Sequence, residues 1–292
     1  MTTSEAAFAK INLYLDVVGR RDDGFHDILS VMHSVSLADT IIISSQAADT
    51  TDITITTNIL ELPVDESNIV YRAVKSYLSY FNIHARVNVR IDKIIPIGAG
   101  LGGGSSNAAA ALRAMNRIYK KADLDQLLSL ASDLGSDVPF CLIGGLAVCT
   151  GRGERVTSLF KAEPMNFVVS IGKSRVSTPK AYADLDLIYD NFNKPTQSAE
   201  PPYKKAIENL KNGCFDVPTY NIFEQVVCLD EIATIKEIMT KNGAEYTLMS
   251  GSGPSVFGKF ADVSKATDAC NALISKGYTA FACYSVYPEV NL

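Results

Sequence analysis

Between residues 96 and 106 the chain carries a glycine-rich segment that leads directly into a helical pattern. Five of the seven residues from Gly98 to Gly104 are glycine, and each costs about 0.5–1 kcal/mol relative to alanine where regular structure is required. The first N–H groups of a helix lack intrahelical partners and lie at the positive end of its dipole, so this arrangement predicts a phosphate-binding loop. A flexible turn with a serine N-cap is the plainer alternative, but a cap needs fewer glycines.

Two better-known nucleotide motifs fit this segment poorly. Gly98, Gly100 and Gly103 satisfy G-x-G-x-x-G, but the dinucleotide fingerprint also needs an acid about 20 residues on, at the end of the next strand. Asp123 lies near that distance and is expected to begin a helix instead. The Walker A pattern fails because no Gly-Lys-Ser/Thr follows. The segment therefore predicts a phosphate without identifying the ligand.

Composition restricts the remaining function classes. The 292 residues are 47% hydrophobic and 20% charged, which are globular proportions. A net charge of -5 provides no basic field for nucleic acid, so we expect no nucleic-acid partner. The N-terminus lacks the features of a signal peptide, and no apolar run approaches the ~20 residues that cross a bilayer. We therefore expect a cytoplasmic protein without a membrane partner. Six scattered cysteines and three histidines make a structural zinc site improbable.

Apolar periodicity predicts strands and helices in alternation. Residues 8–18 alternate, which predicts a half-buried strand with Lys10 and Asn12 on its polar face. Helices are predicted over 68–81 and 105–119, from Asp123 to a stop at Gly135, and over 230–242 and 265–276; strands are predicted over 40–44, 52–57, 87–91, 246–249, 256–260 and 281–286. Many connections are too short for parallel crossovers, which favours a mixed α+β fold. Polar and proline-rich composition places a domain boundary near residue 155, dividing the chain into 1–155 and 156–292.

Two residues outside the glycine segment could take part in phosphoryl transfer. Asp137 precedes Val138-Pro139, and the proline holds the preceding residue extended, so the carboxylate lies in a restrained turn. A kinase needs such a carboxylate to orient the acceptor hydroxyl. An Asx-turn that binds its own backbone is the simpler interpretation. Lys10 could pair with a carboxylate or phosphate, although on spacing alone a lysine that reaches solvent is simpler.

Two further segments could bind a ligand. Phe25 and His26 end a Gly/Asp-rich turn and could recognise a base by stacking and hydrogen bonding, although a surface histidine is the simpler interpretation. The segment from Ser250 to Pro254 could be a tight turn or a second backbone site for phosphate. The residue types leave both questions open.

Three motifs, taken in order, resemble the GHMP kinase superfamily. They are Ala9-Lys10-Ile11-Asn12-Leu13, the segment Gly98–Ser106 and Gly251-Ser252-Gly253-Pro254. The turn Arg21–His26 and the run Ser136-Asp137-Val138-Pro139 resemble the branch whose acceptor carries a cytidine diphosphate group. The resemblance covers about residues 6–260. One departure is Phe25, since that branch commonly has tyrosine there.

The resemblance implies a two-domain GHMP kinase fold, with an α/β N-terminal domain like that of a small-subunit ribosomal protein, a ferredoxin-like C-terminal domain and the active site in the cleft between them. It implies ATP and Mg²⁺ as cofactors, a small-molecule acceptor, and a monomer or homodimer. Asp137 would be the base and Lys10 would hold it ionised. The ATP phosphates would lie on Pro96, Gly98, Gly100, Leu101, Gly102, Gly103, Gly104, Ser105 and Ser106. The acceptor would lie on Asn12, Phe25, His26, Tyr182, Gly251 and Ser252, and Ser106 would ligate the metal.

Three rival functions are compatible with parts of this pattern. Another kinase of the superfamily, acting on homoserine for example, would not need the stacking residues Phe25, His26 and Tyr182. A nucleotide-binding module without catalysis would not need both Lys10 and Asp137. A Rossmann oxidoreductase would bind NADH.

Overall fold

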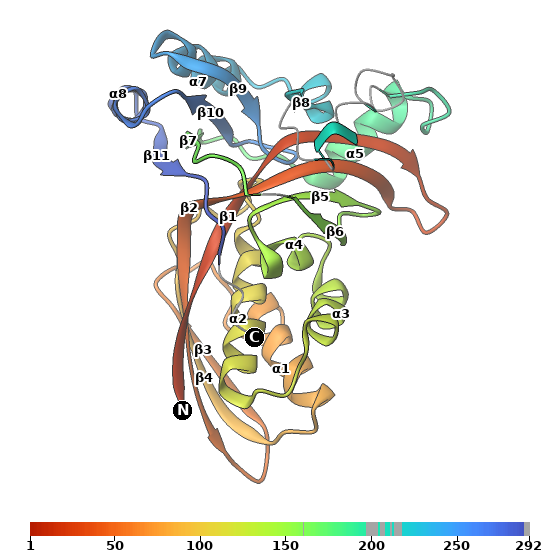
Figure 1. Cartoon of the computed structure of the whole chain (residues 1–292), viewed down its shortest axis with the longest axis vertical. Coiled ribbons are helices and arrows are strands. Elements are labelled where there is room, and N and C mark those ends of the chain that lie inside the picture. The colour runs from red at the N-terminus through yellow and green to blue at the C-terminus, as the bar shows by residue number, and fades with distance from the viewer. Residues whose placement is uncertain (160, 197–203, 205–207, 211, 213–217, 289–292) are drawn as a thin grey trace.

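Two β-sheets form the frame of the molecule, with helices packed against each (Figure 1). The structure is a computed structural model, which describes residues 1–159, 161–196, 204, 208–210, 212 and 218–288. The larger sheet has seven strands and the smaller has four. A long two-stranded ribbon of the larger sheet runs from the end of the molecule that carries the N-terminus to the level of the smaller sheet.

That ribbon consists of β1 (Thr2–Arg20) and β2 (His26–Ala47), which pair antiparallel along their whole length. The larger sheet runs in the order β3-β4-β2-β1-β8, and β5 joins through β2 and carries β6. Its other strands are β3 (Asp52–Thr57), β4 (Ala85–Asp92), β5 (Leu146–Thr150), β6 (Arg155–Ser158) and β8 (Tyr220–Asn221). Register shifts interrupt β1 next to Lys10 and Asn12, where such bulges re-aim side chains.

Four helices belong to the N-terminal half: α1 (Ile69–Tyr80), α2 (Gly103–Tyr119), α3 (Leu124–Leu134) and α4 (Val138–Ile143). Four consecutive alanines, Ala108 to Ala111, are fully buried in α2, which packs against β1, α1 and α4. Asp123 caps α3 and forms a capping box with Gln126, and Gly135 ends the helix. The bounds of α1, α2 and α3 agree with the predicted ones to within two residues, whereas α4 was not predicted.

The smaller sheet contains β7 (Asn166–Ile171), β9 (Ala244–Met249), β10 (Val256–Phe260) and β11 (Thr279–Tyr284), all antiparallel in the order β11-β7-β10-β9. With α7 (Asp230–Lys241) and α8 (Val263–Ser275) packed on it, this is a ferredoxin-like arrangement. Two further elements are α5 (Thr178–Ile188) and the 3₁₀ turn η2 (Ile222–Gln225). The expected α+β, two-domain fold is confirmed. The boundary near residue 155 falls at the start of β6 and stays a prediction.

The prediction that β1 is half-buried is wrong. Lys10, Asn12, Tyr14 and Asp16 are all buried, although they form the polar face of the strand. The reason is tertiary: the segment around Gly251 covers this face, and β8 pairs with β1 along its upper part. Buried polar side chains need hydrogen-bond partners within the protein. This face of β1 is therefore a candidate functional site.

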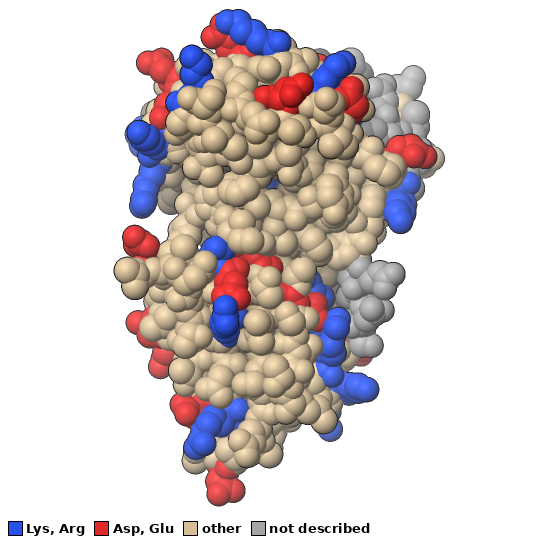
Figure 2. Space-filling model, turned by 90° about the vertical axis from the view of Figure 1, so that its left-hand side faces the viewer, with Lys and Arg blue, Asp and Glu red and all other residues tan. Residues whose placement is uncertain are grey.

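The outer surface carries mixed charge. On the face in Figure 2, Lys and Arg side chains stand among Asp and Glu side chains instead of forming one basic patch. Among the helices that the structure describes, none has the length and apolar character to span a membrane.

Candidate active site

The phosphate loop, residues 96–106, lies between β4 and α2 and keeps the start of that helix open. Gly98, Gly100 and Gly102 adopt left-handed φ values of 69°, 76° and 67°, which favour glycine. The N-cap of α2 is Gly102, with no side-chain cap and no acid in the first turn. The serine N-cap alternative is therefore wrong, and the first amides of the helix remain available to an anion.

Part of the glycine content of this loop serves packing. A Cβ on Gly100 would lie 2.3 Å from the carbonyl oxygen of Ser250, and one on Gly102 would lie 2.9 Å from Lys10 Cγ. In contrast, Gly98 has nothing within 4 Å of its Cβ position. Glycine is therefore required at positions 100 and 102 by contacts within the protein. At Gly98 the space is open, so a ligand could approach the backbone there. The sequence argument considered only the approach of a ligand.

A second glycine loop, residues 250–254, binds the first. The Ser250 hydroxyl donates to the Gly100 carbonyl at 3.1 Å, and the amide of Gly251 donates to Asn12 Oδ1 at 2.9 Å. Because the Gly251 amide already has an acceptor in Asn12, the structure favours the tight-turn interpretation of this segment over a second phosphate site. The loop holds the phosphate loop against β1.

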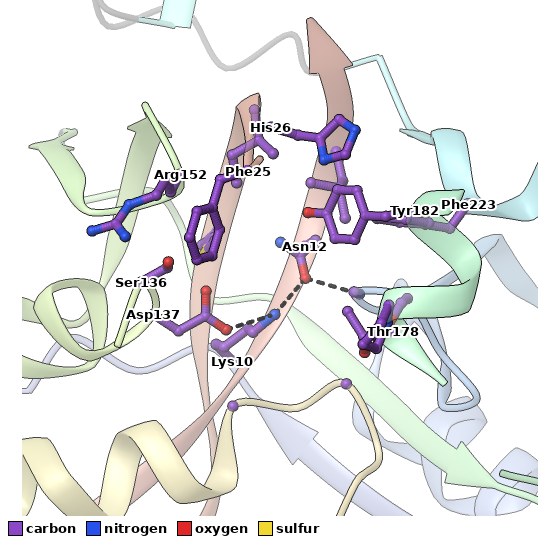
Figure 3. A pocket seen from close by; sticks show the side chains of 18 of the residues that line it. Lys10, Asn12, Phe25, His26, Ser136, Asp137, Arg152, Thr178, Tyr182 and Phe223 are labelled. Carbon is purple, nitrogen blue, oxygen red and sulfur yellow. Dashed lines mark hydrogen bonds and ion pairs between the residues drawn. The ribbon is translucent and has the colours of Figure 1, made fainter. Parts of the chain in front are cut away.

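Lys10 and Asp137 meet above the phosphate loop (Figure 3). Lys10 Nζ lies 3.5 Å from Asp137 Oδ2 and donates to Asn12 Oδ1 at 2.8 Å. The Lys10 side chain is 5% exposed and that of Asp137 is 30% exposed. The simpler interpretation, a lysine that reaches solvent, is therefore wrong. The buried ammonium orients a carboxylate that remains open to a substrate.

Local structure explains how Asp137 is aimed. It follows the end of α3 and is the N-cap residue of α4, but its side chain makes no capping bond. The Asx-turn alternative is therefore wrong, and the carboxylate turns toward Lys10. At the other end of α4, Arg113 from α2 donates to the carbonyl oxygens of Cys141 and Leu142, which fixes the short helix against the long one. Burial raises the pKa of the Cys141 thiol to about 12, so this neighbour stays protonated.

A cavity of about 580 Å³ opens from this pair toward α5. It takes its walls from β1, β2, α5 and both glycine loops. Ten of the residues predicted for the site line it: Lys10, Asn12, Phe25, His26, Gly100, Gly102, Asp137, Tyr182, Gly251 and Ser252. Segments far apart in the sequence thus form one site. Pro96, Gly98, Leu101, Gly103, Gly104, Ser105 and Ser106 lie in the phosphate loop beside it and are not part of its lining.

Aromatic side chains crowd the end of the cavity away from Lys10. Phe25 stands across the cavity from Tyr182, whose ring stacks on His26 at 4.7 Å and 23° (Figure 3). His26 is 9% exposed, so the surface-histidine alternative is wrong. Its Nε2 lies 2.7 Å from Asp186 Oδ1. Burial keeps the pKa of the Tyr182 hydroxyl above its usual range, so this ring is neutral.

Sequence reasoning missed several residues of the cavity. Arg152 places its guanidinium 5.0 Å from the centre of the Phe25 ring, and Thr178 exchanges a hydrogen bond with Ser252 at 2.6 Å. Others are Ser136, Asp186 and Phe223. Arg152 lies between two glycines, a signal of a turn that could have been weighed, and Ser136 belongs to the motif that contains Asp137. Nothing in the local sequence indicated Asp186 or Phe223, because their neighbours come from distant segments.

The metal prediction rests on Ser106, at the first turn of α2. Its hydroxyl is buried and has no partner among the residues that the structure describes. Within the same residues, no group of three His, Cys, Asp or Glu side chains could hold a metal ion. A buried hydroxyl without a partner at a phosphate loop fits a ligand that arrives with the nucleotide.

The sequence as a whole has recognisable relatives. Residues 68–145 match the GHMP kinases N terminal domain, and residues 219–279 match the GHMP kinases C terminal domain. The chain is 38% identical to 4-diphosphocytidyl-2-C-methyl-D-erythritol kinase of Caldicellulosiruptor saccharolyticus, across 95% of this chain and 96% of the relative. It is 37% identical to the enzyme of that name from Listeria innocua, across 98% and 95%. The chain belongs to the 4-diphosphocytidyl-2-C-methyl-D-erythritol kinase branch of the GHMP kinase family.

Solved structures of GHMP kinases agree with this assignment. A crystal structure of 4-(cytidine 5'-diphospho)-2C-methyl-D-erythritol kinase is 31% identical, with a TM-score of 0.77 across 97% of this chain and 99% of the other. Homoserine kinase from Cytophaga hutchinsonii, at 18% identity and a TM-score of 0.66 across 97% and 95%, shares the GHMP fold alone. The resemblance inferred from the three motifs is confirmed.

Proposed function

We propose that this chain transfers the γ-phosphoryl group of ATP to the 2-hydroxyl of 4-(cytidine 5'-diphospho)-2-C-methyl-D-erythritol. The products are the 2-phosphate and ADP, and the reaction serves non-mevalonate isoprenoid precursor biosynthesis. One observation carries the proposal: the Lys10–Asp137 pair, 3.5 Å apart, stands where the phosphate loop meets the cavity that ends in aromatic rings. At this junction a phosphate held by the loop would lie next to an acceptor bound in the cavity.

On the donor side, backbone amides at the start of α2 would hold the ATP phosphates. Ile94 lies just before the loop and Ile97 near its start, and their side chains are 58% and 55% exposed. Large apolar side chains beside an anion site are a suitable surface for a purine ring, whose burial would remove them from water. We therefore assign the adenine to this side of the loop, outside the acceptor cavity.

Mg²⁺ would be held by triphosphate oxygens and the Ser106 hydroxyl, which otherwise lacks a partner among the described residues. When bound, the ion would neutralise charge that develops on the phosphoryl oxygens. The only protein contribution we assign is this hydroxyl, because no acidic cluster stands nearby in the described part of the chain. The chain's own residues perform the other steps.

On the acceptor side, cytosine would lie between Phe25 and the Tyr182–His26 stack. Arg152, over the Phe25 ring, would face the diphosphate of the acceptor. The methylerythritol group would then reach Asn12, Lys10 and Asp137, which follow one another along the cavity (Figure 3). In this orientation the 2-hydroxyl would lie beside the carboxylate.

The chemistry then follows from charge and position. The acceptor oxygen attacks the γ-phosphorus, the bond from phosphorus to the β,γ-bridging oxygen breaks, and ADP leaves. Asp137 takes the hydroxyl proton, and Lys10 faces the oxygen on which negative charge develops. Lys10 and Asn12 fix the place of the carboxylate, so we expect positioning of the reacting atoms to contribute most of the rate.

An ADP-release assay tests the proposal. Turnover is expected with 4-(cytidine 5'-diphospho)-2-C-methyl-D-erythritol, and none with homoserine or mevalonate. The size of the cavity and its aromatic end favour the nucleotide acceptor over homoserine, a small polar molecule that has no ring to stack. Turnover of homoserine alone would overturn the assignment. We also propose that the enzyme works in the cytoplasm as a monomer or homodimer, which sedimentation velocity distinguishes.

A further inference from the structure

A chain of hydrogen bonds runs from Lys10 into the protein core. Asn12 Oδ1 accepts from Lys10 Nζ at 2.8 Å and from the Gly251 amide at 2.9 Å. Asn12 Nδ2 donates to Ser30 Oγ at 2.9 Å, and Ser30 Oγ donates to the Tyr14 carbonyl oxygen at 2.7 Å. Ser30 is fully buried and does not line the cavity. The chemistry described above gives Ser30 no role, so its place at the end of this chain needs an explanation.

The direction of each proton in the chain follows from its donors. The Lys10 ammonium and the Gly251 amide can only donate, so the Asn12 atom that they share must be the oxygen. The amide nitrogen of Asn12 then faces Ser30, whose oxygen must accept, and the hydroxyl proton goes to Tyr14. An Asn12 amide turned by 180° would place its NH₂ group against two donors. Ser30 therefore selects the orientation of Asn12 that Lys10 and Gly251 require.

Ser30 reaches Asn12 at an irregular point of the two-stranded ribbon. The pairing of β1 with β2 shifts register between Asn12 and Tyr14, and Ser30 pairs with Leu15 just beyond the shift. Such a shift re-aims side chains. A hydroxyl at this position can accept one hydrogen bond and donate another, as both neighbours require. Alanine would leave the buried Asn12 amide nitrogen without its acceptor, whereas threonine would keep the hydroxyl.

The Asn12 oxygen joins the lysine to the loop that would carry the phosphate donor. Gly251 belongs to the second glycine loop, whose Ser250 hydroxyl donates to the Gly100 carbonyl of the phosphate loop. A Cβ on Gly251 would lie 3.5 Å from Lys10 Nζ, so the second glycine loop stands directly against the lysine. One amide oxygen thus helps to set the distance from Lys10 to the phosphate loop.

We propose that Ser30 is a positioning residue for phosphoryl transfer. It holds the Asn12 amide so that one oxygen places Lys10 relative to both Asp137 and the phosphate loop. The inference rests on the proposed function, because it assumes that transfer occurs at the Lys10–Asp137 pair. Ser30 acts through Asn12 and touches no substrate. Its loss loosens Lys10 but leaves the loop amides that would hold ATP in place.

A double-mutant cycle on the full chain tests this, with ADP release measured at saturating ATP and cytidine acceptor. Ser30→Ala should lower kcat about 10-fold, because the reacting groups lose alignment, and leave KM for ATP within about twofold. Ser30→Thr should stay within about twofold of the wild type. In an Asn12→Ala background, Ser30→Ala should lower kcat by less than about twofold more, because no amide remains to be held.

Hydrogen exchange of the Gly251 amide provides a second measurement that does not depend on turnover. In Ser30→Ala the Asn12 oxygen is no longer fixed, so this amide should exchange about tenfold faster, as followed by NMR. Ser30→Thr should exchange at the wild-type rate. If the alanine variant does not fold, Ser30→Cys takes its place, since a thiol is a weak acceptor of similar size. It should lower kcat about threefold or more and speed the same exchange.

Ser34→Ala is the matched control. Ser34 is also a buried serine of β2, but its hydroxyl accepts from the Gly145 amide and does not line the cavity, so kcat should stay within about twofold. Thermal unfolding of each variant identifies loss of fold. Independent, multiplicative effects of the Ser30 and Asn12 substitutions, or an unchanged Gly251 exchange rate, would overturn the inference. If the wild type fails to phosphorylate the cytidine acceptor, the proposed function is at fault, and the exchange rate still decides whether Ser30 holds Asn12.

Discussion

In the proposed active site, main-chain atoms form the donor side and side chains form the acceptor side. The donor side is made of backbone: glycines whose Cβ positions are blocked by Ser250 or Lys10, and helix amides without a cap. The acceptor side is made of side chains, with Phe25, Tyr182 and Arg152 meeting from three separate segments. A triphosphate is the same in every ATP-dependent kinase, so main-chain amides suffice. An acceptor must be told apart from similar molecules, and only side chains can do that.

The pair that joins the two sides should be the most sensitive point. Asp137→Asn is expected to reduce kcat about 10²–10⁴-fold, because it removes the proton acceptor while keeping the shape of the side chain. Since Asp137 makes no capping bond, ATP affinity and thermal stability should stay close to those of the wild type. Single-turnover kinetics and nucleotide titration measure both.

Asp133→Asn, an exposed change on α3, is the control and should behave as the wild type. Retained turnover combined with a large loss of stability would show that Asp137 holds the turn between α3 and α4, and that the catalytic assignment is wrong.

On the donor side, alanine substitutions at Gly98 and Gly100 should reduce the free energy of unfolding by different amounts. Gly98→Ala forces a left-handed backbone on alanine in open space, which costs about 1–2 kcal/mol of unfolding free energy. Gly100→Ala adds a clash with the Ser250 carbonyl, where the Cβ would lie at 2.3 Å, and should cost about 2 kcal/mol more. Urea unfolding of the two variants provides the comparison. Equal losses would mean that the two glycine loops separate easily and that packing does not determine the glycine at position 100.

Substitutions on the acceptor side should raise KM for the acceptor and leave KM for ATP unchanged. His26→Ala is expected to raise KM for the cytidine acceptor about 10–100-fold and leave KM for ATP within about twofold, because the ring lies in the aromatic end of the cavity. Steady-state kinetics with each substrate varied in turn measure the split. If both KM values rose together, His26 would support the whole cleft instead of the base.

The smallest effect is expected at the rim of the cavity. Arg152→Gln should raise KM for the acceptor about tenfold, and the ionic-strength dependence of that KM should weaken, because a cation that faces the diphosphate is lost. Arg155→Gln is the control, since Arg155 is 73% exposed and pairs with Glu154. An unchanged salt dependence would indicate that Arg152 only covers Phe25.

Features that depend on neighbouring residues were predictable from the sequence, and contacts between distant segments were not. The capping box at Asp123 and the stop at Gly135 are local signals, so the bounds of α3 were predictable. The motifs around Lys10, Gly98–Ser106 and Asp137 supported the correct family. The burial of Lys10 was not predictable, because the group that covers it comes from the Gly251 segment, far along the chain. Asp186 was missed for the same reason: its partner His26 is 160 residues away.

By itself, the sequence determined many of the helices and strands and the glycine-rich loop, since these depend on periodicity, on glycine's freedom at positive φ and on caps within a few residues. The family followed from the resemblance of three motifs. Only the tertiary structure decided that Lys10 faces Asp137 and not solvent, that Gly100 is required by Ser250, and that His26 is held by Asp186. Each of these contacts joins segments that are far apart in the sequence. A local sequence pattern contains no information about which distant segments will pack together.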